Sequence, residues 1–207
     1  MLLLENIILP ILEGFGLGAS LIIAIGAQNA FVLKQGLKKQ HLLLTASLCV
    51  FFDVILISLG VSGLSLIISN RPVLLVVLRI AGAIFLILYG LRSLWELRHP
   101  HALIAQLDGK QQSVKQTILA LMAFTFLNPH TYIDTMLLIG SVGAQYNTLE
   151  QPFFILGVLI ASAVWFYGIV YAASLLAPYF KKPGTWYFIN ILMAVIMFYI
   201  AFSLLHS

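Results

Sequence analysis

The sequence FLNPHTYIDT, residues 126–135, interrupts a long apolar stretch with an asparagine followed by a proline. Asparagine is a favoured helix N-cap, and proline is favoured at the first helical position, where its missing N–H costs no hydrogen bond. We therefore predict that one helix ends before Asn128 and that a new helix begins at Pro129. The free N–H groups and positive dipole end of the new helix suit an anionic group such as an α-carboxylate.

This break lies in a chain of 207 residues, of which 61% are hydrophobic and only 9% are charged. A typical soluble domain carries about 25% charged residues, so the composition excludes a water-soluble surface. A membrane helix needs about 20 apolar residues, and six stretches meet that length. We predict an all-α membrane protein with transmembrane helices near residues 8–33, 42–69, 72–94, 116–140, 152–177 and 185–205. A five-span alternative, with a re-entrant first stretch, stays open because residues 13–18 contain Glu13 and three glycines.

Basic residues fall mainly in the first, third and fifth connections between these spans, with Arg71 alone in the second. The positive-inside rule then places both termini outside the cytoplasm. Because the net charge of +4 follows this topology, it gives no support for a nucleic-acid partner. The basic residues of the odd-numbered connections are Lys34, Lys38, Lys39, Arg92, Arg98, Lys110, Lys115, Lys181 and Lys182.

Two further features bound the fold class. The single cysteine, Cys49, excludes an internal disulfide and any Cys-x-x-Cys motif. The N-terminus lacks the positive region and cleavage site of a signal peptide, so we interpret it as retained.

The longest connection, residues 95–115, is polar and predicts a cytoplasmic linker between two halves, residues 1–94 and 116–207, of a single transmembrane domain, 1–207. A second polar break, GAQN at residues 26–29, lies about one hundred residues before Asn128. Because each half has three helices, similar halves would have opposite orientations. We therefore predict two inverted three-helix repeats with broken first and fourth helices, and a site where the breaks meet near the midplane.

Two aspartates lie inside the predicted spans. Asp53 follows the basic turn at residues 38–41 by roughly a dozen residues, which places it near the bilayer centre at ~1.5 Å per residue. Asp134 lies one turn beyond Pro129. An aspartate at the centre of a membrane helix costs about 2.5–3.5 kcal/mol on insertion scales, so it normally faces a cavity or a partner. The two carboxylates predict a net negative site for a cationic substrate or a proton, with Arg79 as partner in the alternative where they only hold helices together.

His130 and Asp134 have the i, i+4 spacing that places two side chains on one helix face. This is also a metal-ligand spacing, but the spans contain no cluster of further ligands, so we expect no metal and interpret His130 as a polar lining residue. Trp165 lies in mid-span, where its ring either meets a ligand cation or only packs.

With these residues in view, the chain resembles the LysE family of amino-acid exporters. The resemblance implies a bacterial inner-membrane exporter of lysine or arginine that is driven by the proton gradient or the membrane potential. The sequence contains no Walker-type phosphate loop and no Gly-x-Ser-x-Gly or His-Glu-x-x-His motif, so we expect neither an enzyme nor a cofactor. One departure is that the family commonly has proline where this chain has Ala27, which leaves the first helix free to be more continuous. The motifs that carry the resemblance include residues 18–20, 24–36, 126–135, 140–146, 161–166 and 189–190, with Asp53.

The predicted substrate site combines the polar residues and the resemblance. It consists of Gln28, Asn29, Asp53, Asn128, Pro129, His130, Asp134 and Trp165. Two other classes stay open: a divalent-metal or inorganic-cation permease using Asp53, His130 and Asp134, and a non-transporting membrane scaffold. The sequence leaves open lysine against arginine, proton coupling, and the oligomeric state, a homo-oligomer included.

Overall fold

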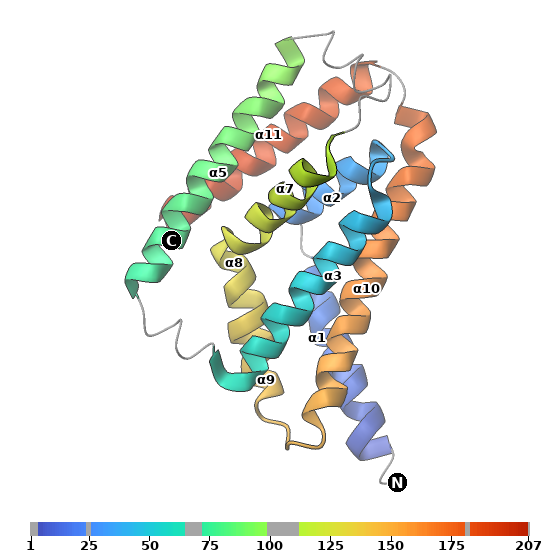
Figure 1. The fold of residues 1–207 in the computed structure, drawn as a ribbon, viewed down its shortest axis with the longest axis vertical. Coiled ribbons are helices and arrows are strands. Elements are labelled where there is room, and N and C mark those ends of the chain that lie inside the picture. The colour runs from blue at the N-terminus through green and yellow to red at the C-terminus, as the bar shows by residue number, and fades with distance from the viewer. Residues whose placement is uncertain (1–3, 24–25, 65–71, 99–111, 181–182, 207) are drawn as a thin grey trace.

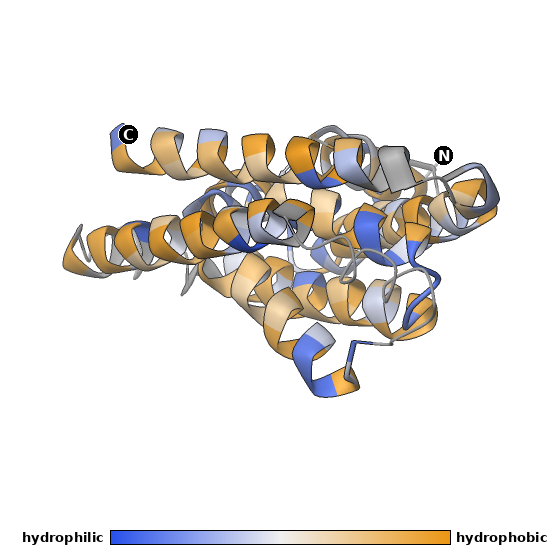
Figure 2. Ribbon diagram, turned by 90° about the horizontal axis from the view of Figure 1, so that it is seen from above, coloured by the Kyte–Doolittle hydropathy of each residue, from blue (hydrophilic) through white to orange (hydrophobic). Residues whose placement is uncertain are grey.

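The computed structural model describes residues 4–23, 26–64, 72–98, 112–180 and 183–206. Within these ranges every regular element is a helix, as the composition predicts. Figure 1 shows the long helices lying along the longest axis of the molecule, and Figure 2 shows apolar residues over most of their length. Large apolar side chains such as Leu43, Leu88 and Val195 are exposed on the outside, where they suit contact with lipid.

The first predicted span consists of two helices that meet at a sharp break. The π-helix η1 (Leu4–Ile8) leads into α1 (Leu9–Ile22), and α2 (Ala27–Leu37) follows at a bend of 83°. Gly26, which precedes α2, has an extended backbone with φ −120° and ψ 176°. The break is therefore present although Ala27 stands where the family commonly has proline.

The remaining predicted spans also coincide with helices. The elements are α3 (Leu42–Leu59) with the π-helix η2 (Gly60–Leu64); α5 (Pro72–Arg98); α7 (Val114–Phe126), α8 (Pro129–Thr131), the π-helix η3 (Tyr132–Ile139) and α9 (Gly140–Gly143); α10 (Gln151–Leu176) with the 3-10 helix η4 (Ala177–Phe180); and α11 (Pro183–His206). Within the described residues, three helices are long and apolar enough to cross a membrane alone, and four spans result if α1 and α2 are one bent span. Of the predicted linker, residues 99–111 lie outside the described residues.

Glycines bring α1 and α10 into close contact. A Cβ atom on Gly14 would lie 2.2 Å from the carbonyl oxygen of Phe154, and one on Gly157 would lie 2.1 Å from that of Ile11. No side chain fits at these positions, so the two backbones pack directly against each other. α10 also packs on α2 and α3, while α5 pairs with α11 on the other side of the molecule (Figure 1).

At the end of the bundle that holds the α2–α3 turn, hydrogen bonds join this turn to the residues that precede α7. Gln35 Nε2 donates to Gln112 Oε1 over 2.8 Å, and His41 Nε2 lies 2.7 Å from the Gln112 carbonyl oxygen. Lys39 and His41 adopt left-handed backbone angles in this turn. Directly beneath, the rings of Phe31 and Phe124 are 5.0 Å apart in a buried aromatic cluster.

At the opposite end, the turn between α9 and α10 contacts α1. The hydroxyl of Tyr146 donates to Glu13 Oε2, and its ring stacks on Phe154 at 5.0 Å. Burial and the hydrogen bond to Glu13 raise the pKa of Tyr146 to about 12, so the phenol stays protonated at physiological pH.

Candidate functional site

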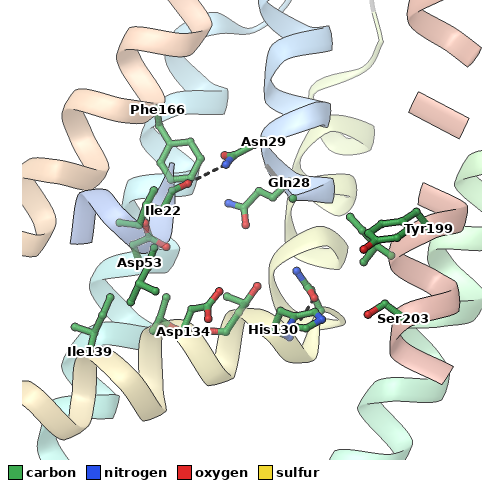
Figure 3. Close-up of a pocket in the computed structure, with 16 residues that line it drawn as sticks. Ile22, Gln28, Asn29, Asp53, His130, Asp134, Ile139, Phe166, Tyr199 and Ser203 are labelled. Carbon is green, nitrogen blue, oxygen red and sulfur yellow. Dashed lines mark hydrogen bonds between the residues drawn. The ribbon is translucent and has the colours of Figure 1, made fainter. Parts of the chain in front are cut away.

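A cavity of about 360 Å³ lies where the two broken spans meet (Figure 3). Ligand sites for small molecules typically occupy about 300–1,000 Å³, so this cavity has the size for a single small solute. Its walls come from α1, α2, α3, α10 and α11, and from the segment that begins at Asn128. The polar lining residues are Gln28, Asn29, Asp53, Asn128, His130, Thr131, Asp134, Thr135, Tyr199 and Ser203.

The cavity brings together six of the eight residues predicted for the site. They are Gln28, Asn29, Asp53, Asn128, His130 and Asp134. Pro129 is buried at the first position of α8 and is not one of the lining residues. Trp165 is half-buried on α10 and contacts the site through its indole N–H, which donates to Asn29 Oδ1 over 3.2 Å.

The break in the fourth span has the capping geometry that the Asn-Pro pair predicts. The Asn128 side chain accepts a hydrogen bond from the His130 backbone N–H at 3.2 Å, and Pro129 occupies the first helical position. The Tyr132 hydroxyl donates to the Phe126 carbonyl oxygen, which is near the end of α7, at 2.8 Å. Both sides of the break thus gain hydrogen bonds from side chains, as a break inside a membrane requires.

The break in the first span presents two amides to the cavity. Asn29 Nδ2 donates to the Ile22 carbonyl oxygen at 2.8 Å, while the Gln28 side chain extends into the cavity (Figure 3). Gln28 Nε2 is buried and has no hydrogen-bond acceptor among the residues that the structure describes. The Cys49 thiol also faces this amide, yet sulfur accepts hydrogen bonds only weakly. An acceptor atom on a bound solute would satisfy this buried donor.

Two carboxylates make the cavity acidic. Asp53 on α3 is 4% exposed, and Asp134 on η3 is half-buried, with both side chains directed toward the cavity (Figure 3). Among the lining residues that the structure describes, none is a lysine or an arginine. The hydrogen bond to Asp53 comes from Ser162 on α10, at 2.6 Å, rather than from Arg79.

His130 and Asp134 both line the cavity, as their spacing predicts. In the part of the chain that the structure describes, no three histidine, cysteine, aspartate or glutamate side chains gather closely enough to hold a metal ion.

Five polar residues at or beside the cavity were not among the predicted site residues: Thr131, Thr135, Tyr199, Ser203 and Ser162. Tyr199 and Ser203 on α11 line the cavity opposite Asp53, and Ser162 contacts Asp53 from behind. Tyr199 and Ser203 are four residues apart in the mostly apolar C-terminal half of α11, and this i, i+4 pair was a usable signal. Ser162 gave no such signal, since a serine in a membrane helix commonly bonds its own backbone.

A helical membrane bundle with broken helices around an acidic, solute-sized cavity defines a translocator of small cations. The chain belongs to the LysE family: the family described as LysE type translocator matches residues 19–207. This membership places it among multi-pass membrane transporters rather than enzymes.

Similar proteins carry a more specific description. The arginine exporter protein ArgO of Yersinia enterocolitica is 39% identical over 193 residues, which cover 93% of this chain and 94% of the relative. The proteins of the same name from Salmonella enteritidis and Salmonella typhimurium are each 38% identical over 192 residues, covering 93% of this chain and 91% of the relative. No solved structure matches the chain.

Proposed function

We propose that this protein exports a basic L-amino acid, arginine foremost and lysine as the second candidate, across the bacterial inner membrane. The observation that carries the proposal is the pair of carboxylates, Asp53 and Asp134, in a cavity between two helix breaks. A guanidinium or ammonium group would meet opposite charge there, and the low dielectric of the membrane strengthens such pairing. The arginine-exporter description of the similar proteins supports the choice of substrate.

The two ends of the amino acid are bound by different parts of the cavity in this proposal. The substrate carboxylate lies near the helix that begins at Pro129, whose dipole favours an anion, and accepts a hydrogen bond from the orphaned Gln28 Nε2. The side-chain cation lies toward Asp53 and Asp134. His130 and Asn29 complete the polar lining, and Trp165 contributes through Asn29.

The architecture proposed for transport has six membrane crossings in two inverted halves, 1–94 and 116–207, joined by the linker 95–115. Its support is that each half starts with a broken span, α1/α2 and α7/α8, and that both breaks border the cavity. Rocking of one half against the other would open the cavity to either side in turn.

Orientation and energy source belong to the same proposal. The basic connections lie in the cytoplasm, and export is coupled to the proton gradient or the membrane potential. Either force acts on a cationic substrate: the membrane potential is worth about 2.3 kcal/mol per charge per 100 mV, and Asp53 and Asp134 offer sites for a countertransported proton.

The test is counterflow of radiolabelled arginine and lysine in proteoliposomes that contain the purified protein. We expect exchange of at least one of them, and a loss of at least about thirtyfold in Asp53→Asn, because a buried charge pair is truncated. Glu13→Gln is the matched control, since Glu13 is an exposed carboxylate that does not line the cavity. If neither amino acid exchanges under an imposed pH gradient and potential, the proposal is wrong, and divalent cations are the next solutes to test.

A further inference from the structure

Ser162 forms a buried hydrogen bond between two helices. Its Oγ on α10 donates to Asp53 Oδ2 on α3 over 2.6 Å, and the two residues are 0% and 4% exposed. The other serine of α10 behaves differently: Ser174 Oγ donates to the carbonyl oxygen of Tyr171, three residues earlier in its own helix. Ser162 therefore donates its hydrogen bond to the site carboxylate and not to a carbonyl of its own helix.

The length of this bond is that of a charge-assisted hydrogen bond. Hydroxyl donors reach carboxylates at about 2.5–2.7 Å, and such bonds are roughly twice as strong as those between neutral groups. Because one carboxylate oxygen is held, the rotation of the Asp53 side chain is restricted. A carboxylate accepts about four hydrogen bonds, so Asp53, which lines the cavity, keeps acceptor capacity for a ligand.

Trp165, one helical turn further along α10, likewise donates a hydrogen bond to a residue of the site, Asn29. Its Nε1 donates to Asn29 Oδ1 over 3.2 Å, while Asn29 Nδ2 donates to the Ile22 carbonyl oxygen. The carboxamide of Asn29 is thus fixed at both ends. Phe166, the next residue on this face, lines the cavity itself.

α10 is well suited to hold both groups in place. It is an unbroken helix of 26 residues that packs against α1, α2 and α3. Close backbone contacts fix it to the broken first span, because a Cβ on Gly36 of α2 would lie 2.7 Å from the Val170 carbonyl oxygen. The hydroxyl and the indole N–H therefore approach the site from one rigid element.

We propose that Ser162 and Trp165 are positioning residues of the amino-acid site: from one face of α10 they hold the Asp53 carboxylate and the Asn29 carboxamide in the orientation that the bound basic amino acid meets. This inference rests on the proposed export function. Ser162 is fully buried and Trp165 is not a lining residue, so each acts through its partner and not by touching the substrate.

The test compares Ser162→Ala, Ser162→Cys and Trp165→Phe in arginine counterflow, with KM and maximal rate measured separately. A hydrogen bond to a charged group is lost in Ser162→Ala, so we expect KM to rise about tenfold at a nearly unchanged maximal rate. Ser162→Cys, which keeps a weaker donor, should lie between alanine and the wild type. Trp165→Phe keeps an aromatic ring but removes the N–H, and we expect a rise of about threefold.

The controls are two other hydrogen-bonding residues of α10. Ser174→Ala removes a buried hydroxyl that bonds its own helix, and Tyr167→Phe removes a hydroxyl that faces Ser47 on the exposed side. Both should leave KM unchanged. Arginine-induced thermal stabilisation of each purified variant gives a second measure of binding, independent of flux.

The outcomes separate this inference from the proposed function. A higher KM and a smaller arginine-induced thermal shift in Ser162→Ala, absent from Ser174→Ala, support the positioning role. An unchanged KM in a folded Ser162→Ala protein overturns it, as does a fall in maximal rate and folded yield alone, even while the wild type still exchanges arginine. Failure of the wild type to exchange either basic amino acid overturns the proposed function instead.

Discussion

Asn29 bridges the break in the first span by reaching back to Ile22, whose carbonyl oxygen accepts a hydrogen bond from Asn29 Nδ2 at 2.8 Å. The last carbonyls of any helix lack an intrahelical partner. Inside a membrane an unsatisfied backbone group costs several kcal/mol, because no water replaces the missing donor. The amide of Asn29 thus supplies, from the start of α2, a donor that the end of α1 needs.

Replacing Asn29 with alanine is expected to destabilise the protein by about 1–3 kcal/mol, since the Ile22 carbonyl and the Trp165 indole lose this partner together. The measurement is the thermal unfolding midpoint of the purified protein in detergent. Ser20→Ala is the control, because Ser20 is exposed and its hydroxyl donates to the carbonyl of Leu17 in its own helix. Equal midpoints for the two variants would show that Asn29 does not stabilise the break.

The local signals in the sequence predict most of the helical segments and the positions of both breaks, although only the second break has a capping signal. Asn128 and Pro129 act through their own backbone and side-chain chemistry, so a helix start at Pro129 follows from the sequence alone. The apolar stretches likewise coincide with helices, because membrane helices satisfy their backbone groups internally whatever their neighbours are.

The geometry of the first break and the contact of Ser162 with Asp53 depend on how different helices pack against each other. Gly26 and Ala27 do not by themselves end a helix, and the hydrogen bond from Asn29 to Ile22 exists only at the bend between α1 and α2. The partnership of Ser162 with Asp53 joins residues 109 positions apart, and no local pattern encodes which helices become neighbours.

Gly82 on α5 packs closely against the backbone at the second break. A Cβ atom at this position would lie 2.0 Å from the carbonyl oxygen of Leu127, the residue before Asn128. Gly82→Ala therefore forces the backbone at the break to move, and we expect a loss of about 1–3 kcal/mol in stability together with reduced arginine exchange.

Gly168→Ala is the matched control for this substitution. A Cβ atom on Gly168 meets nothing within 4 Å, and alanine is favoured over glycine in a helix by about 1 kcal/mol. The control should unfold at the same temperature or slightly higher. Thermal unfolding and counterflow measured on both variants check the prediction, and wild-type behaviour of Gly82→Ala would contradict the contact with Leu127.

Lys34 and Asn190 join α2 to α11 inside the protein. Lys34 Nζ donates to Asn190 Oδ1 over 2.8 Å, and the residues are 5% and 0% exposed. Asn190→Ala removes this acceptor from a buried ammonium group and should cost about 1.5–3 kcal/mol, the usual worth of a hydrogen bond to a charged group. Replacing both partners with apolar residues of similar size, as in Lys34→Met with Asn190→Leu, should be nearly neutral.

A double-mutant cycle on thermal unfolding measures the coupling between Lys34 and Asn190. The expected result is that the double variant is more stable than Asn190→Leu alone and lies within about 1 kcal/mol of the wild type. Strictly additive losses in Lys34→Met and Asn190→Leu would mean that the two side chains do not stabilise each other.

Asn128 has two roles in the proposed mechanism, and substitutions separate them. Its side chain caps the helix that begins at Pro129, and it also lines the cavity beside the proposed position of the substrate carboxylate. Asn128→Ala loses the cap and should lower stability by about 0.5–2 kcal/mol. Asn128→Ser keeps a capping oxygen and should retain both stability and exchange.

Asn128→Asp is the decisive variant, because it changes stability and transport in different directions. Aspartate is as good a cap as asparagine, and its negative charge is favourable at a helix N-terminus. The same charge repels a carboxylate bound at that helix start. We therefore expect unfolding at or above the wild-type temperature, together with a KM for arginine raised about tenfold or more, measured by counterflow. A stable Asn128→Asp protein with unchanged KM would place the substrate carboxylate elsewhere in the cavity, with Gln28 as the next group to vary.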